Sequence, residues 1–261
     1  MTSRVQFAHE MEALGKEVEE MGELARLAIE KAVKLIVTGD YYLKDEVRKL
    51  DKELYRYEMM IERHCTDIIA LYTPVASDLR RVSVSWKIIE DLSRIGRYAW
   101  DIAEIAEVFD GQKFKKVLSL PQMASQVVGM VTDSLDYYTT GNAVEARKLF
   151  DRDDEIDELY DTIFREMLTY MFEDPKKITI GIHYILIARY LERVADHACN
   201  IGERVVYMVT GERWDPANRK RKLPSNNSSA ETYPQEVAKR RKDPGQIEEA
   251  GDFHQHELAD K

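Results

Sequence analysis

Four oxygen-bearing side chains recur at steps of four, four and three residues in one stretch of the chain: Glu192, Asp196, Asn200 and Glu203. On a helix, residues three and four apart share a face, so these side chains form a single row. Carboxylate and amide oxygens are the ligands that hard cations prefer, and the row therefore indicates a metal site. The alternative is a solvated face paired with neighbouring arginines, because like charges four apart cost only about 0.2–0.5 kcal/mol per pair.

A second acidic row precedes the first. Asp153, Asp157 and Asp161 step by four along the helix predicted immediately before it, and consecutive helices joined by a short turn are antiparallel neighbours. Carboxylates from both helices would then converge on one cation or a small cluster, for which Mg²⁺, Ca²⁺ or Mn²⁺ are suitable ions. The alternative remains an acidic edge balanced by nearby arginines. The predicted ligands are Asp153, Asp157, Asp161, Glu192, Asp196, Asn200 and Glu203.

The elements that must position these rows are all helical. Apolar residues recur at threes and fours throughout the first 210 residues, and glycine or proline marks each interruption, at Gly39, Pro74, Gly111, Gly141 and Pro175. The β-branched run at 178–188 continues without a turn into a periodic segment, which favours a buried helix over a strand. The predicted helices cover about 5–38, 41–72, 78–110, 122–139, 142–173 and 177–210.

The chain also repeats itself. Val37 to Asp40 matches Thr139 to Asn142 at an offset of 102, and Leu92 to Ile95 matches Leu191 to Val194 at an offset of 99. Two copies of a three-helix unit predict two tandem three-helix bundles joined by residues 110–121. The first repeat covers 1–111, the second covers 112–214, and a polar tail covers 215–261.

The segment LERVADHACNIGE, residues 191–203, resembles the signature of the PhoU family. The resemblance covers about residues 5–212. It implies an all-helical fold with a repeated three-helix unit, and metal ions, iron among them, on acidic E/DxxxD pairs. Glu192 and Asp196 form such a pair here, and Asn200 and Glu203 occupy the N-I-x-E continuation. The metal would be a divalent or trivalent ion, and iron, manganese, magnesium and calcium all remain open.

The resemblance further implies a non-enzymatic, cytoplasmic regulator of phosphate uptake and phosphate-starvation signalling. Its partners would be the ATPase subunit of a phosphate ABC transporter and, in many bacteria, a sensor histidine kinase. The family often forms homodimers, so we expect one here.

The first repeat departs from the family pattern. Tyr55, Ser93 and Arg97 stand where the second repeat has Asp157, Glu192 and Asp196. An arginine does not bind a cation, so we expect one metal-competent repeat and one held by ion pairs, with Glu90 on the face of Arg94 and Arg97 as a candidate partner.

Composition argues against two further classes of function, nucleic-acid binding and membrane insertion. The 261 residues carry a net charge of −10, which argues against general nucleic-acid binding, and no apolar run is long enough for membrane insertion. Residues 215–261 hold nine basic and nine acidic residues with few apolar ones, so we expect disorder there. Two alternatives stay open: a metal-dependent phosphohydrolase, for which only His197 offers a nearby base, and a helical adaptor that works through its tail. Neither GxxxxGK[ST] nor GxSxG occurs.

Overall fold

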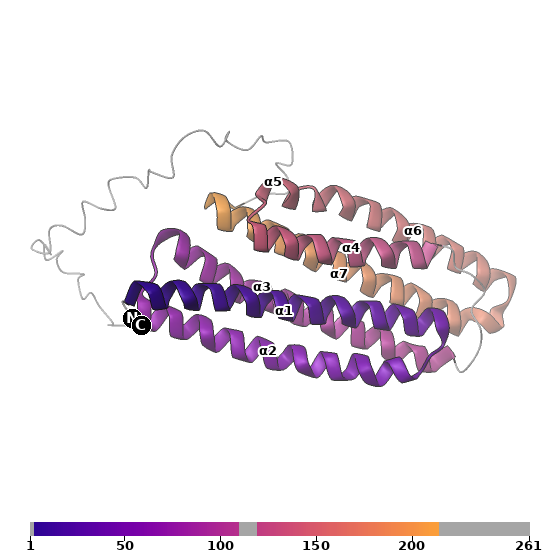
Figure 1. Ribbon diagram of the computed structural model, residues 1–261. Coiled ribbons are helices and arrows are strands. Elements are labelled where there is room, and N and C mark those ends of the chain that lie inside the picture. The colour runs from indigo at the N-terminus through magenta and orange to yellow at the C-terminus, as the bar shows by residue number, and fades with distance from the viewer. Residues whose placement is uncertain (1–2, 110–118, 214–261) are drawn as a thin grey trace, which may run out of the picture. The chain divides into compact units, whose positions relative to one another are not determined.

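The structure, a computed structural model, describes residues 3–109 and 119–213, and every regular element in these ranges is helical (Figure 1). The predicted all-α fold is confirmed. The tail predicted to be disordered, and most of the loop between the repeats, lie outside the described residues. The elements are α1 (Ser3–Thr38), α2 (Tyr42–Tyr72), α3 (Ala76–Ile105), the 3₁₀ turn η1 (Ala106–Phe109), α4 (Ser119–Thr140), α5 (Ala143–Ala146), α6 (Leu149–Glu173), the 3₁₀ turn η2 (Pro175–Lys177) and α7 (Ile178–Thr210).

The helix predicted at 142–173 is divided into α5 and α6. Hydrogen bonds between residues three apart replace the helical pattern at the break, as in the bond from the Lys148 amide to the Glu145 carbonyl at 2.9 Å. The break lies against α7, where a Cβ added to Gly202 would approach the Ala146 carbonyl oxygen to 3.0 Å. The chain therefore leaves helical geometry where its backbone lies against Gly202 of α7.

Glycine ends helices at equivalent places in the two repeats. Gly39 after α1 and Gly141 after α4 both adopt the left-handed conformation, with φ of 70° and 65°. Gly211 ends α7 in the same way, with φ of 74°. These positions need the conformational freedom of glycine, and they confirm the punctuation of the repeat seen in the sequence.

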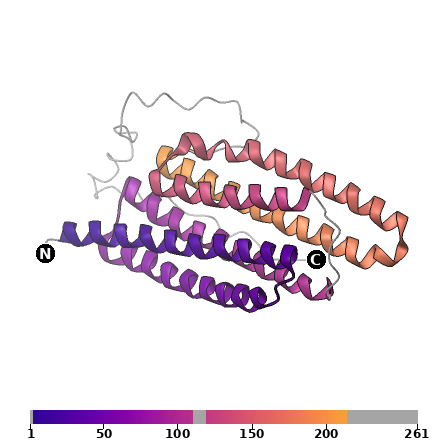
Figure 2. The same cartoon turned by 45° about the vertical axis from the view of Figure 1, so that its right-hand side comes forward.

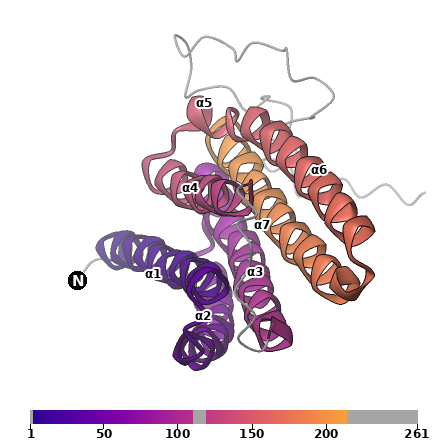
Figure 3. The same ribbon diagram turned by 90° about the vertical axis from the view of Figure 1, so that its right-hand side faces the viewer.

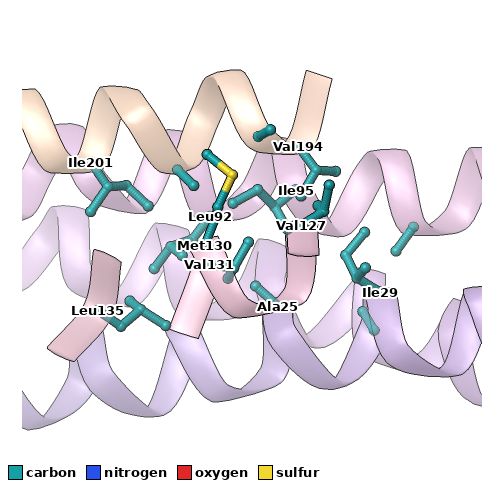
Figure 4. Packing of buried hydrophobic residues seen from close by; sticks show 14 of the residues in the cluster. Ala25, Ile29, Leu92, Ile95, Val127, Met130, Val131, Leu135, Val194 and Ile201 are labelled. Carbon is teal, nitrogen blue, oxygen red and sulfur yellow. The ribbon is translucent and has the colours of Figure 1, made fainter. Parts of the chain in front are cut away.

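Each repeat forms a trio of packed helices. Helices α1, α2 and α3 pack on one another, as do α4, α6 and α7, and the two trios remain distinct in the views turned by 45° and 90° (Figures 2 and 3). The trios meet where α3 packs on α7 and α1 on α4. Buried apolar side chains from both repeats interdigitate in one cluster (Figure 4), among them Ala25, Ile29, Leu92, Ile95, Val127, Met130, Val131, Leu135, Val194 and Ile201. The predicted bundles thus share one core.

Helices α3 and α7 run antiparallel. The start of α3 lies by the end of α7, where Arg80 Nε donates to the Met208 carbonyl oxygen at 3.4 Å. At the opposite end, the rings of Phe109 and Tyr184 lie 5.2 Å apart, centroid to centroid.

The contacts between α3 and α7 obey an approximate two-fold symmetry. His197 contacts Asp91, and their equivalents at the offset of 99, Tyr98 and Tyr190, contact each other with ring centroids 5.8 Å apart. Tyr98 and His197, which are equivalents of each other, also lie 5.8 Å apart. An axis close to these two rings therefore relates the repeats.

Asp91 carries a charge into this contact. Asp91 is only 3% exposed, and two side chains from α7 lie on either side of it. His197 Nδ1 lies 2.8 Å from Asp91 Oδ1, and Arg204 Nε lies 3.0 Å from Oδ2. The Arg204 contact is an ion pair without the alignment of a hydrogen bond. A buried carboxylate between the repeats is thus partnered entirely from the second repeat.

We expect Asp91→Asn to lower the free energy of unfolding by roughly 3 kcal/mol, because it leaves a half-buried guanidinium without its charge partner. Urea denaturation at neutral pH measures the loss. Glu90→Gln, next in the chain but exposed, is the matched control and should change stability by less than about 0.5 kcal/mol. Equal stabilities for the two variants would show that Asp91 does not hold the repeats together.

Candidate functional site

Helices α6 and α7 bring two acidic pairs together. Asp153 and Asp157 lie on α6, Glu192 and Asp196 lie on α7, and η2 joins the two helices as antiparallel neighbours. The side chains are close enough for their charges to act on one another: Asp196, Asp157 and Glu192 all raise the pKa of Asp153. This grouping is the part of the predicted metal site that the structure assembles.

Arginines partner only half of the assembled carboxylates: Glu192 pairs with Arg189 and Asp196 lies 3.7 Å from Arg193, whereas Asp153 and Asp157 form no ion pair with a described residue. Burial, and then the charge of Asp196, raise the pKa of Asp153 to about 6. The same two causes, in the same order, raise the pKa values of Asp157 and Glu192. Arg189 Nη1 donates to Glu192 Oε1 at 2.5 Å, but Glu192 Oε2 is buried with no hydrogen-bond partner in the described structure. The cluster is therefore strained electrostatically at neutral pH.

The other three predicted ligands are less closely grouped. Asp161 adds, after burial and the charge of Asp196, to the raised pKa of Asp157, but its side chain is 68% exposed and lies 3.9 Å from Arg165 in an ion pair. Asn200 and Glu203 line a separate hollow of about 290 Å³, on the side where α7 faces Ser83 and Lys87 of α3. The structure thus gathers four of the seven residues.

The donor chemistry of the four fits a hard cation, since carboxylate oxygens are its preferred ligands and one of them has no protein donor. Their present spacing is looser than a metal site requires. Within residues 3–109 and 119–213, no three histidine, cysteine, aspartate or glutamate side chains are grouped closely enough to hold a metal ion. Metal binding here remains a prediction.

His197 faces α3. The hydrolase alternative needs this imidazole as a base beside the acidic cluster, yet its ring contacts Asp91 and Tyr98 of α3, and its side chain is only 19% exposed. Sequence reasoning missed Asp91, although a signal was present. Asp91 stands three residues after Ile88 and four before Ile95, on the apolar stripe of α3, where a charge requires a buried partner.

The first repeat has a hollow at the equivalent place. It measures about 1040 Å³, lies between α2 and α3, and is lined in part by Tyr55, Ser93 and Arg97. The Ser93 hydroxyl donates to Glu58 Oε2 at 2.6 Å, and Arg97 Nη1 donates to Asp51 Oδ2 at 3.4 Å. An ion pair is present as expected, but it crosses from α3 to α2 and does not use Glu90.

The fold and these faces define a class: an all-helical protein of two three-helix repeats related by an approximate two-fold axis. In the described ranges, no helix combines the length and apolarity needed to cross a membrane. The sequence profile described as PhoU domain matches residues 18–106 and 120–205. The chain belongs to the PhoU family.

Several relatives are similar over most of their length. A phosphate-specific transport system accessory protein PhoU homolog of Deinococcus radiodurans is 41% identical, across 66% of this chain and 81% of its own. The homolog of the same name from Clostridium acetobutylicum is 32% identical, across 82% and 99%. The crystal structure of PhoU from Pseudomonas aeruginosa superposes with a TM-score of 0.76 at 34% identity, covering 79% of this chain and 100% of that one.

The raised pKa of Asp153 leads to a prediction for the metal-free protein. Its folded pKa of about 6 lies above the ordinary value of 3.8, so protonation favours the folded state and stability rises as pH falls from 7 towards 5. Asp153→Asn removes the repulsion and should stabilise the protein by about 1 kcal/mol at pH 7, a figure reduced for partial solvent exposure. The gain should vanish below pH 4.

Chemical denaturation in the presence of a chelator, at pH 7 and pH 5, measures both effects. Asp161→Asn is the matched control, since Asp161 is exposed and paired with Arg165. If Asp153→Asn were no more stable than Asp161→Asn at pH 7, the acidic cluster would not repel itself as inferred.

Proposed function

We propose that this chain is a non-enzymatic, cytoplasmic regulator of phosphate uptake and phosphate-starvation signalling. The observation that carries the proposal is its similarity, over nearly the whole length of the relatives, to proteins named as accessories of a phosphate-specific transport system. The proposed partner is the ATPase subunit of a phosphate ABC transporter, joined by a sensor histidine kinase where the host has one. A homodimer belongs to the same proposal.

The described surface exposes several large apolar side chains. They include Tyr42 at 87% exposed, Leu71 at 74% and Phe172 at 85%. Tyr42 and Leu71 stand at opposite ends of α2, so these side chains do not form one apolar patch of the kind that marks a contact site. The described residues give no support to the hydrolase alternative, because the histidine it requires contacts Asp91 and Tyr98 of α3 and not the acidic cluster.

Affinity purification of the full chain from cells grown with high and with low phosphate tests the proposed contact. We expect the transporter ATPase subunit to be recovered, in amounts that depend on phosphate. A chain ending at residue 213 separates the adaptor alternative, because recovery should persist without the tail if the helical body makes the contact. Loss of the ATPase subunit only in the shortened chain would favour the tail, and its absence from both samples would contradict the proposal.

A second part of the proposal is a metal ion on the acidic faces of the second repeat. Asp153, Asp157, Glu192 and Asp196 would hold it, and the unpartnered Glu192 Oε2 supports this assignment. A bound cation would neutralise the cluster and offer open coordination positions to an oxygen ligand of a partner. Asp161, Asn200 and Glu203 remain predicted ligands whose side chains are less closely grouped with the four.

Metal content after loading with Mn²⁺ or Fe²⁺, followed by desalting, tests this site. Asp196→Ala should lose the bound metal, and with it the rise in melting temperature that the metal produces. Ser93→Glu, in the first repeat, should leave both values unchanged, since Arg97 still stands beside it. Equal metal content in the wild type and Asp196→Ala would remove the proposed site.

A further inference from the structure

The hollow between α2 and α3 is lined mainly by charged side chains. Its volume of about 1040 Å³ lies just above the roughly 300–1,000 Å³ typical of small-molecule sites. Of the nine lining residues, four are basic and three are acidic, which gives a net charge of +1. The basic residues are Lys52, Arg56, Arg94 and Arg97.

The equivalent positions of the second repeat carry the opposite sign. At offsets of 102 on α6 and 99 on α7, the nine positions hold six acidic and two basic residues, a net charge of −4. Arg97 is replaced by Asp196, Lys52 by Asp154 and Arg56 by Glu158. One scaffold thus presents two equivalent faces whose charges differ by five, so the two faces suit ligands of opposite sign.

The basic groups in the first repeat are largely free to bind. Lys52 and Arg94 form no ion pair with any residue that the structure describes, and both are exposed. Arg56 reaches only Glu53, at 4.0 Å. The charge of the fourth basic residue, Arg97, is partly neutralised by Asp51, which lies 3.4 Å away.

The acidic residues of the hollow are partly engaged by neighbouring side chains. Asp51 is neutralised by Arg97 at 3.4 Å, whereas Glu58 keeps its charge and is held by a hydrogen bond from the Ser93 hydroxyl at 2.6 Å. Only Glu90 lacks a partner of this kind among the described residues, and it lies on the exposed surface of α3.

We propose that this hollow binds a small phosphate-bearing anion larger than orthophosphate, such as a nucleotide or a polyphosphate. Guanidinium groups bind phosphate oxygens through paired hydrogen bonds, and Arg94 has these donors free. The hollow exceeds the size of a single phosphate, and the ring of Tyr55, 62% exposed, stands at its lining to contact the rest of the ligand. The preference for phosphate over a carboxylate rests on the proposed function.

Calorimetric titration of the full chain with pyrophosphate and with ATP, at low salt and with a chelator present, tests the proposal without metal. We expect saturable binding of at least one of the two, with one ligand per chain, weakening as salt is added. Arg94→Gln should weaken the affinity about tenfold or more, since a hydrogen bond to a charged group is lost. The affinity of Arg94→Lys should lie between those of the wild type and Arg94→Gln. Arg193→Gln, the equivalent change in the second repeat, is the matched control and should leave binding intact.

Absence of saturable binding for both probes would overturn the proposal. Binding that survives Arg94→Gln would place the anion elsewhere, for example on the basic blocks of the tail, and would overturn it as well. Citrate bound as tightly as pyrophosphate would contradict the preference for phosphate. Because these titrations use the isolated chain, they can fail while the transporter contact is confirmed, and the reverse also holds. Circular dichroism melts check that each variant is folded.

Discussion

The carboxylate of Asp91 is buried where the two repeats meet, and its partners both come from α7. Burying a charge costs several kcal/mol unless it is paired, so the packing of α3 on α7 must supply a cation or a hydrogen-bond donor at that point. A shift of one helical turn, about 5.4 Å, would carry His197 and Arg204 away from Asp91. Apolar contacts are not directional and would tolerate such a shift far better. The polar cluster therefore specifies the register that the apolar core alone would leave loose.

That register also determines which faces of α3 and α7 point away from the shared core. With the inner faces of α3 and α7 occupied by the shared core, the remaining polar faces of these helices are turned towards α2 and α6. Core positions must keep apolar side chains of similar size, because removing or adding side-chain volume there lowers the stability of the fold by about 1–5 kcal/mol. Exposed charges contribute only about 0–1 kcal/mol per pair, so the outer faces can change sign without loss of the fold. The contrast between Arg97 and Asp196 is an example of such a change.

The features predicted correctly from the sequence are local ones. Helical periodicity and the glycines at 39, 141 and 211 depend on residues close together in the chain, and the repeat at offsets of 99 and 102 is a match between two such local patterns. The interruption between α5 and α6 was missed because it arises where the chain approaches Gly202 of α7, a contact over 50 residues distant in sequence. The position of Asp91 on the apolar stripe of α3 was a local signal, but its partners could not be predicted for the same reason, since they lie in the other repeat.

The four residues of the predicted row on α7 are spread both around and along the helix, for a geometric reason. Each step of four residues turns a helix about 40° beyond a full circle, so Asn200 is rotated by about 80° from Glu192 and faces α3. Glu203 returns to nearly the same angle, but it lies about 16 Å further along the axis than Glu192. A spacing rule identifies residues on one side of a helix, whereas convergence on one ion also requires them to lie at one level.

The opposite charges of these two faces make the net charge of the chain a poor guide to the ligand that each face suits. The charge of −10 would repel anions from the whole surface if it acted at long range. At physiological ionic strength, interactions between exposed charges fade beyond about 8 Å. A ligand inside the hollow between α2 and α3 would therefore be influenced mainly by Lys52, Arg56, Arg94 and their immediate neighbours, and only weakly by the acidic cluster of the other repeat. Each face of this duplicated fold can thus select its ligand by its own local charge.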